Sequence, residues 1–295
     1  MVIIGKRAGQ LGNRLFVFAH IIANAIEYGY EVQNPSFYGY GHYFKGTQDD
    51  FFCRFPARKS GYNIPALQKV FYQLLTTCLL PLSNFNRLAK LLNISFLDID
   101  PKTYPAESYD MTNSEYVHLA TANNLLIIKD PWLFRDSAHL QKHNDQVRLF
   151  FAPIEKHSRA IADLIVRARQ DCDVLVGIHI RQGDYKRWQG GTYYFSTSEY
   201  AAAMSRFAAT MPEKRIKFLI CSNEKQDEAI FHGLNYIVGN DHQLEDMYAF
   251  AQCDLLIGPP STYTLWASFY GSVPLFILKA ADAQINCSEF HITNG

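Results

Sequence analysis

The sequence predicts an α/β protein with a parallel, doubly wound sheet in its second half. Short apolar runs alternate there with helical patterns, and the chain begins with a strand, a glycine-punctuated loop and a helix. Its 295 residues are enough for two domains, each with a core of its own. Because ligands of such sheets bind beyond the carboxyl ends of the strands, we expect functional residues directly after the apolar runs.

The spacing of apolar residues predicts the individual elements. In the first half we expect a strand at 2–5, a helix at 15–26, helical segments within 65–92 that break at Pro81, and a strand at 125–129. A charged amphipathic helix at 154–170 joins the two halves. In the second half we expect strands at 173–180, 216–221, 236–238, 255–257 and 273–278, and helices at 198–211, 226–232, 244–252 and 264–270.

Composition limits the classes of function. Hydrophobic residues make up 48% of the chain and charged residues 19%, which is typical of an ordered globular protein. Lys plus Arg and Asp plus Glu number 28 each, so the chain has no overall field that would hold a nucleic acid. The six cysteines contain no CxxC pair, which indicates reduced thiols and a cytoplasmic location.

The longest apolar segment, at 74–82, is interrupted by Thr76, Thr77 and Pro81 and is far below the length that spans a bilayer. We expect it to form a buried helix; the alternative is a helix that rests on a membrane surface. The apolar residues before Lys6 are too few for a signal peptide. We therefore expect a cytoplasmic protein. If the segment at 74–82 rests on a membrane, the protein would lie at the inner face of that membrane.

The loop after the first strand is the first candidate for an anion site. Gly9-Gln10-Leu11-Gly12-Asn13 lets backbone amides approach a ligand, and the helix that follows offers its positive N-terminus. The spacing matches neither GxGxxG nor a Walker loop, because no Gly-Lys-Ser/Thr follows. A plain tight turn is the alternative explanation.

His179 and Arg181 lie at the end of the strand expected at 173–180, on the same side of it, because side chains alternate along a strand. The guanidinium of Arg181 can bind a diphosphate through two parallel hydrogen bonds. Gly183 allows a tight turn, and Asp184 would orient either Arg181 or a substrate hydroxyl. The alternative is a structural ion pair between Arg181 and Asp184 that closes the turn.

Two further strand ends carry polar residues. Ser222 and Asn223 follow one strand of the second half, where they contact a ribose or base or simply cap a helix. Ser261 and Thr262 follow another strand and a Pro-Pro turn, and they cap the next helix, bind phosphate, or do both. Since the carboxyl ends of parallel strands share one edge of a sheet, we expect these residues to lie near Arg181.

Two short acidic patterns formally match the DxD sequence that holds a divalent ion in many sugar-nucleotide enzymes. Asp98-Ile99-Asp100 precedes Pro101, and Asp171-Cys172-Asp173 lies before a strand, at the end away from the expected ligand edge. We interpret both as solvated turns. The histidines lack a ligand spacing such as HExxH, so we expect neither a metal nor another cofactor. The charge of a leaving diphosphate would then be met by Arg181, helix termini and backbone amides.

Several segments, taken in order along the chain, share a pattern with one enzyme family. They are GQLGNRLF at 9–16, HIRQGDY at 179–185, Tyr193-Tyr194, Glu199-Tyr200, SNE at 222–224, Asp246-Met247 with Cys253, and STYTLW at 261–266. They resemble the GGLGNQMFQ opening, the HxRRGDY motif and its following segment, the SDD-like tip and the DM…C…NSTFSWW stretch of the α-1,2-fucosyltransferases, glycosyltransferase family 11. The resemblance covers nearly the whole chain.

The resemblance implies a GT-B architecture, in which two Rossmann-like domains face each other across a cleft. Residues 1–155 would form the acceptor-side domain, and residues 156–295 the domain that binds the nucleotide sugar. It also implies an inverting, metal-independent transfer of L-fucose from GDP-fucose to a hydroxyl of a glycan acceptor. That acceptor would be a free or a lipid-linked glycan, and the latter brings peripheral membrane association with it.

The resemblance also assigns roles by position. Arg181 would stabilise the leaving diphosphate, with His179 and Asp184 shaping the site and Asn13 facing it across the cleft. The remaining candidates would bind the donor: Gly9, Gln10, Gly12, Ser222, Asn223, Asp246, Ser261 and Thr262.

Some departures from the family pattern bear on the identity of the donor. Gln182 stands in place of the second arginine of HxRRGDY and removes a positive charge near the expected diphosphate. Gly258-Pro259-Pro260 stands where the family has an asparagine before Ser-Thr, and Leu265 replaces one of the paired tryptophans. Two alternatives stay open: a donor other than GDP-fucose, and a protein that binds a sugar nucleotide without turnover.

Overall fold

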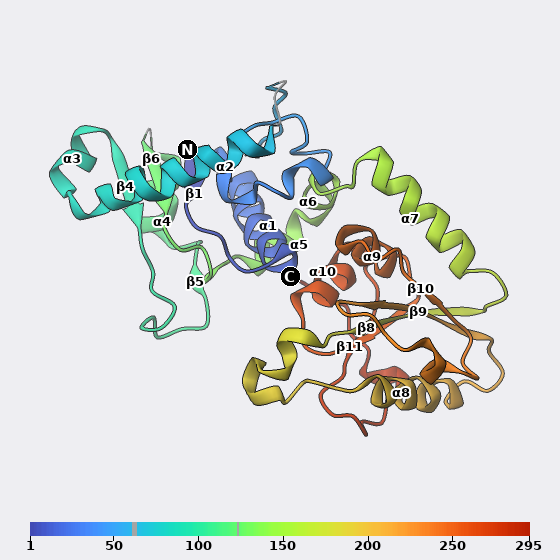
Figure 1. The fold of residues 1–295 in the computed structure, drawn as a ribbon. Coiled ribbons are helices and arrows are strands. Elements are labelled where there is room, and N and C mark those ends of the chain that lie inside the picture. Colours follow the sequence, from blue (N-terminus) through green and yellow to red (C-terminus); the bar gives the residue numbers. More distant parts are fainter. Residues whose placement is uncertain (61–63, 123) are drawn as a thin grey trace. The chain divides into compact units, whose positions relative to one another are not determined.

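The computed structural model describes residues 1–60, 64–122 and 124–295 (Figure 1). The chain divides into two compact units: unit 1 comprises Met1–Ile154 and Asn294–Gly295, and unit 2 comprises Glu155–Thr293. The last two residues thus group with unit 1, where the sequence placed them with the second half. The reason is local contact, because Ser137 Oγ donates a hydrogen bond of 3.2 Å to the carbonyl of Gly295.

Unit 1 is built on a five-stranded sheet with the order β3-β2-β1-β6-β4. Its strands are β1 (Val2–Ile4), β2 (Val32–Gln33), β3 (Arg54–Phe55), β4 (Ile94–Leu97) and β6 (Leu125–Ile128). All neighbours pair in parallel except β2 and β3, which are antiparallel. β1 is the central strand: β2 and β3 lie on one side of it, and β6 and β4 lie on the other. The strand order therefore reverses at β1, and the loop after β1 lies where a ligand site is expected.

The helix that follows β1 is longer than the sequence predicted. α1 (Leu11–Tyr28) begins inside the glycine loop and ends at Gly29, whose φ of 73° is in the left-handed region that glycine adopts without strain. It packs against α5 (Ser137–Lys142) and α6 (Asn144–Phe150). The other elements of the unit are α2 (Pro65–Leu74), α3 (Asn86–Leu91), α4 (Ser114–Thr121) and the small sheet of β5 (Tyr109–Asp110) and β7 (Phe134–Arg135).

The apolar segment at 74–82 is not the buried helix that we expected. After α2, a π-helical turn (η3, Leu75–Leu79) and a 3-10 helix (η4, Leu80–Asn84) lead to α3. Within this segment only Leu75 and Leu80 are buried, and both belong to the cluster that covers Ile3 of β1 and Ile127 of β6. Leu75 and Leu80 therefore reach the sheet, and the partly buried Leu79 packs against the same cluster, whereas the other side chains of the segment remain partly or fully exposed.

Unit 2 confirms the predicted parallel, doubly wound sheet. Its strand order is β10-β9-β8-β11-β12, and every neighbouring pair is parallel. The strands are β8 (Val174–Ile180), β9 (Ile216–Ser222), β10 (Tyr236–Val238), β11 (Leu255–Gly258) and β12 (Leu275–Ile277). The chain winds outward from β8 to β10 and then returns to β11 on the other side of β8. The switch point, where ligands of such sheets bind, therefore lies between the ends of β8 and β11.

Helices cover both faces of this sheet. Figure 1 shows α8 on one face and α9 and α10 on the other. The helices are α7 (Glu155–Ala168), α8 (Thr197–Ala209), α9 (Gln243–Phe250) and α10 (Thr262–Gly271), and the helix expected at 226–232 is a 3-10 helix, η7 (Glu228–Phe231). A capping box of Ser196 and Glu199 fixes the start of α8. None of the helices in the described part of the chain has both the length and the apolar character that a membrane crossing needs.

Candidate functional site

The end of β8 carries the first candidate, His179. Its side chain is 3% exposed, and its ring lies against Tyr263 with the ring centroids 4.9 Å apart. Gly258 at the end of β11 is directly adjacent: a Cβ atom on it would lie 2.9 Å from the Cβ of His179. Glycine at this position lets the two strand ends of the switch point come together around the imidazole.

Burial and, second, the charge of Arg181 lower the pKa of His179 to about 3, so the imidazole is neutral at physiological pH. Its Nδ1 atom is buried and has no hydrogen-bond partner among the described residues. An unsatisfied buried polar atom costs about 1–3 kcal/mol. His179 therefore offers a neutral polar atom at the switch point that a ligand can satisfy.

Arg181 forms the ion pair that we gave as the structural alternative. Its Nη2 lies 2.9 Å from Oδ2 of Asp184, and its guanidinium is 5.5 Å from the centroid of the Tyr185 ring. The side chain of Asp184 is 54% exposed. An ion pair with one exposed partner contributes only about 0–1 kcal/mol. The pair is therefore weak enough for an anion with more charge to replace Asp184 as the partner of Arg181.

Gln182, which stands where the family motif has a second arginine, points into the protein. The residue is 7% exposed. Its Nε2 donates to the carbonyl of Phe195 at 3.0 Å, and its Oε1 accepts from Gln226 Nε2 at 3.0 Å. Its backbone N–H donates to Asn223 Oδ1 at 2.8 Å. Gln182 therefore connects the end of β8 to the loop after β9 and to the segment before α8.

The loop after β9 contacts the same turn but does not cap a helix. The 3-10 helix η7 is capped by Asp227, so the capping role that we considered for Ser222 and Asn223 is wrong. Ser222 Oγ accepts from the N–H of Glu224 at 3.1 Å and so shapes the loop. Gly183 has a φ of 51°, and a Cβ on it would lie 2.9 Å from Nδ2 of Asn223. The two loops are thus in direct contact.

The N-terminus of α10 lies next to the β8 turn. Ser261 is the N-cap, and its Oγ accepts from the N–H of Tyr263 at 3.2 Å, so the predicted cap is present. Thr262 is the first residue of the helix and is partly exposed. Tyr185 donates from its hydroxyl to the carbonyl of Pro260 and ties the turn after β8 to this helix. Arg181 and the free amides of a helix N-terminus thus lie at one sheet edge.

Asp246 has a structural role in the same half of the sheet. It is 5% exposed, and its Oδ1 accepts from the N–H of Asn240 at 2.7 Å. Burial raises the pKa of this carboxyl to about 6. A Cβ on Gly239 would lie 2.5 Å from the same oxygen, so the loop between β10 and α9 closes tightly over it. The carboxylate of Asp246 therefore stabilises the loop between β10 and α9.

The glycine loop of unit 1 forms the second group of candidates. Gly9 has a φ of 58°, and a Cβ on it would lie 2.2 Å from Nδ2 of Asn13, so the loop folds back on the first turn of α1. Gln10 is the N-cap residue, but its side chain does not cap the helix. Gly12 is buried in the first turn. These residues belong to unit 1, and their facing the site of unit 2 remains a prediction.

Two arginines that we did not predict as site residues lie beside this loop. Arg14 donates from Nε to the carbonyl of Gly9 at 3.0 Å, and its guanidinium lies 4.9 Å from the centroid of the Tyr40 ring. The guanidinium of Arg7 lies 4.2 Å from the centroid of the Tyr38 ring. The available signal was Arg14 itself, which stands where the family motif GGLGNQ has a glutamine. Two guanidinium groups therefore lie beside the loop that follows β1.

The two DxD patterns, which we interpreted as solvated turns, lie outside the helices and strands: residues 98–100 lead into a turn at 101–103, and Asp171 lies in a turn after α7. Asp98 forms an ion pair of 2.5 Å with Lys129 and is about half exposed. Asp173 forms one of 2.9 Å with Arg215, at the far end of the sheet from Arg181.

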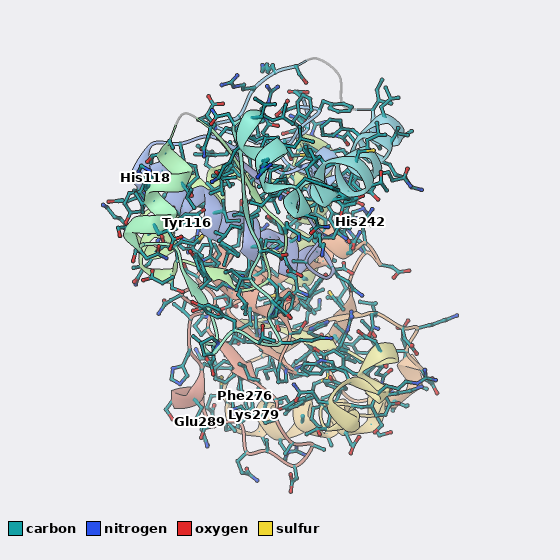
Figure 2. The ribbon with its side chains drawn as sticks, turned by 90° about the vertical axis from the view of Figure 1, so that its left-hand side faces the viewer. Tyr116, His118, His242, Phe276, Lys279 and Glu289 are labelled. Atoms are coloured by element: carbon teal, nitrogen blue, oxygen red, sulfur yellow. The ribbon has the colours of Figure 1, made fainter. Side chains whose placement is uncertain are left out.

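One group of metal-type donors is present elsewhere in unit 2. His157, His242 (Figure 2) and Glu245 place one ligand atom each within 4.8 Å of one another. His157 Nδ1 hydrogen-bonds to Glu245 at 2.8 Å, and Asn240 donates to the second oxygen of that carboxylate at 2.9 Å. Zinc–ligand bonds of about 2.1 Å need donors within about 4.2 Å of one another. The group therefore fits a hydrogen-bonded link between α7 and α9 better than a formed zinc site.

Comparison with known proteins bears on the fold. No family model and no curated protein matches the sequence. The structure is similar to a mutant of Arabidopsis thaliana FUT1 in complex with GDP (TM-score 0.57, 13% identity, 98% of this chain and 73% of that chain). It is also similar to POFUT1 in complex with GDP-fucose (0.55, 10%, 92% and 94%). A third similar structure is NodZ alpha-1,6-fucosyltransferase soaked with GDP-fucose (0.54, 14%, 96% and 97%). These likenesses confirm the predicted α/β fold, that of GT-B fucosyltransferases.

Proposed function

We propose that the protein is a glycosyltransferase that transfers a fucosyl group from GDP-fucose to a hydroxyl of a glycan acceptor. In this proposal it is an inverting, metal-independent enzyme and a divergent relative of the α-1,2-fucosyltransferases of family 11. The observation that carries the proposal is the position of Arg181. It lies at the switch point of a doubly wound sheet, beside a helix N-terminus, in a fold whose solved examples hold GDP or GDP-fucose.

The donor diphosphate is proposed to lie between the ends of β8 and β11. Arg181 would exchange its contact with Asp184 for two parallel hydrogen bonds to phosphate oxygens. The first amides of α10, with the hydroxyl of Thr262, would bind the other phosphate oxygens. Ser261 would keep its capping bond and orient this terminus. Ser222 and Asn223 extend the same edge toward the nucleoside.

The reaction is a displacement at the anomeric carbon. The acceptor oxygen forms a bond to that carbon from the face opposite GDP, its proton passes to solvent water, the bond to the β-phosphate oxygen breaks, and the electron pair of that bond remains on the diphosphate. Arg181 and the α10 amides stabilise the charge that develops there. His179 is neutral and contributes a polar atom, not a charge. As the resemblance implies, Gly9, Gln10 and Gly12 are proposed to bind the donor and Asn13 to take part in the reaction, because orientation supplies much of the rate of such a reaction.

The alternative, a protein that binds the donor without turnover, depends on Gln182 as a charge lost from the site. In this chain Gln182 is buried and hydrogen-bonded to Phe195 and Gln226. The glutamine therefore has a structural role, which the loss of a charge from a donor site would not require. The other alternative, a donor other than GDP-fucose, is tested by the nucleotide panel described next.

Two measurements test the proposal. In a thermal-shift panel of GDP, UDP, ADP and GDP-fucose, only the guanine nucleotides should raise the melting temperature. Arg181→Ala should lower the release of GDP from GDP-fucose on a glycan array by about 100-fold or more, with little change in melting temperature. Arg215→Ala is the matched control, because it removes an arginine–aspartate pair from the other end of the sheet.

The outcomes separate the alternatives. A shift with UDP alone would identify another donor. Tight GDP binding without GDP release on any acceptor would contradict the enzyme. A loss of melting temperature in Arg181→Ala that is far larger than in Arg215→Ala would assign Arg181 to structure.

A further inference from the structure

The segment from α2 to α3 exposes an unusual amount of apolar surface. Among the described residues, fifteen large apolar side chains are exposed, and eight of them fall within residues 64–92. They are Ile64 (44%), Leu67 (53%), Val70 (50%), Leu74 (55%), Phe85 (62%), Leu88 (42%), Leu91 (82%) and Leu92 (52%). Single exposed apolar residues are ordinary, but such a concentration marks an interaction surface. We call these eight residues the apolar face.

The apolar face follows one side of each helix. On α2 the residues are spaced at 64, 67, 70 and 74, which places them within about 120° of one another at 100° per residue. On α3 the spacing 85, 88, 91 and 92 has the same effect. The contacts with the unit begin at the border of this side: Gln68 on α2 and Ala89 on α3 are buried about 40° beyond it, and the half-buried Phe71 packs on Phe51 and Phe52. Each helix therefore packs inward next to an apolar side, most of which faces outward.

The charges beside the apolar face are all positive. Residues 51–97 contain Arg54, Arg58, Lys59, Lys69, Arg87 and Lys90 but no aspartate or glutamate. Arg54 and Arg58 are paired with Asp50 and Glu31. Within the described residues, Lys69, Arg87 and Lys90 form no ion pair. In the helical projection Arg87 lies about 40° from the edge of the apolar side of α3, and Lys69 and Lys90 lie about 100° from the edge of the apolar side of their own helix, on its polar side.

We propose that the apolar face binds the surface of an anionic lipid bilayer. Amphipathic helices with leucine and phenylalanine on one side and lysine or arginine on the polar side lie in the plane of a membrane and bind anionic headgroups. The charge complementarity favours a bilayer over a protein partner, because the buried centres of protein interfaces are depleted in lysine. The proposal does not depend on the sugar donor, although it would bring a lipid-linked acceptor close to unit 1.

The fold allows this surface to be tested without disturbing the core. α2, η3, η4 and α3 follow one another along an edge of unit 1 (Figure 1). They are anchored by Leu75 and Leu80, which are buried against the sheet. Substitutions of Leu67 and Leu91, which are 53% and 82% exposed, leave these anchors in place.

Flotation with lipid vesicles tests the proposal on the full chain. Wild-type protein should float with vesicles of phosphatidylcholine and phosphatidylglycerol and much less with phosphatidylcholine alone. Each basic residue near an anionic surface contributes about fivefold to binding, so Lys69→Glu/Arg87→Glu/Lys90→Glu should weaken it by more than about 100-fold. Leu67→Ser/Leu91→Ser should also abolish flotation. The melting temperature and the shift produced by GDP should be unchanged in both variants.

Matched controls come from unit 2. Val166→Ser removes an apolar side chain that is 65% exposed on α7, and Lys214→Glu reverses an exposed charge; both should float like wild type. Absence of wild-type flotation, or flotation that survives both α2–α3 variants, would overturn the proposal. So would a dimer in vesicle-free solution that Leu67→Ser/Leu91→Ser dissociates, because the apolar face would then be a protein interface.

Discussion

Replacing Gln182 with arginine, the residue of the family motif, should destabilise unit 2 and should not improve GDP binding. The side chain is 7% exposed and makes two hydrogen bonds, one donated to Phe195 and one accepted from Gln226. An arginine can donate to the carbonyl of Phe195 but cannot accept from Gln226. It would also carry a charge into a site where no carboxylate is its partner in the structure, which costs several kcal/mol.

Gln182→Met gives the reference for this magnitude. Methionine keeps the length of the side chain but removes both hydrogen bonds, and it leaves the carbonyl of Phe195 without its donor. That loss costs about 1–3 kcal/mol. In a domain of this size 1 kcal/mol lowers the melting temperature by about 2–4 °C. The expected order of stability is therefore wild type, then Gln182→Met, then Gln182→Arg.

Differential scanning fluorimetry and calorimetric titration with GDP measure the two quantities separately. Gln226→Ala is an informative companion, because it removes the donor to Gln182 from the other side and should cost less than Gln182→Arg. The reasoning would be refuted by a Gln182→Arg protein that melts like wild type and binds GDP more tightly. That result would show that position 182 faces the diphosphate and that the glutamine is a lost charge.

Three further predictions concern pH, packing and metals. Because the pKa of Asp246 is raised to about 6 in the fold, its neutral form is the favoured one; the free energy of unfolding should fall as pH rises from about 4 to 6. Asp246→Asn should lack this slope in urea denaturation, and equal slopes would contradict it. Gly258→Ala, whose Cβ would lie 2.9 Å from that of His179, should cost about 1–3 kcal/mol by overpacking, and an unchanged melting curve would contradict the contact. EDTA should leave GDP release unchanged, and activity restored by a divalent ion would contradict a metal-independent reaction.

The sheet of unit 2 was predictable because its strands are continuous apolar runs. A buried parallel strand such as β8 reads as such a run, and its helices begin with caps that have a sequence signature, as Ser196 and Glu199 do. Unit 1 was less legible. β2, β3, β5 and β7 have two residues each, which is too short for any periodicity to appear.

The direction of single side chains at the site was not predictable. His179 and Arg181 were placed correctly at the strand end by the period of two, but the burial of Gln182 depends on Phe195 and Gln226, which are 13 and 44 positions away. The exposure of α2 and α3 was missed for the same reason. An apolar run has the same sequence whether a sheet or solvent covers it, and in the segment 74–82 only Leu75 and Leu80 are buried.

The relation between His179 and Arg181 determines where positive charge resides at the switch point. Burial keeps the imidazole neutral, with a pKa of about 3, and the neighbouring guanidinium adds to this effect. Diphosphate binding should therefore depend on Arg181 and helix dipoles, whose charge is constant between pH 5 and 8. GDP titrates in this range itself, since the second pKa of a phosphate is about 6. The pH dependence of GDP affinity should thus be the same in wild type and in His179→Asn. A wild-type protein that takes up one proton more than the variant on binding GDP would show that the diphosphate protonates His179, and the histidine would then share the charge of the leaving group with Arg181.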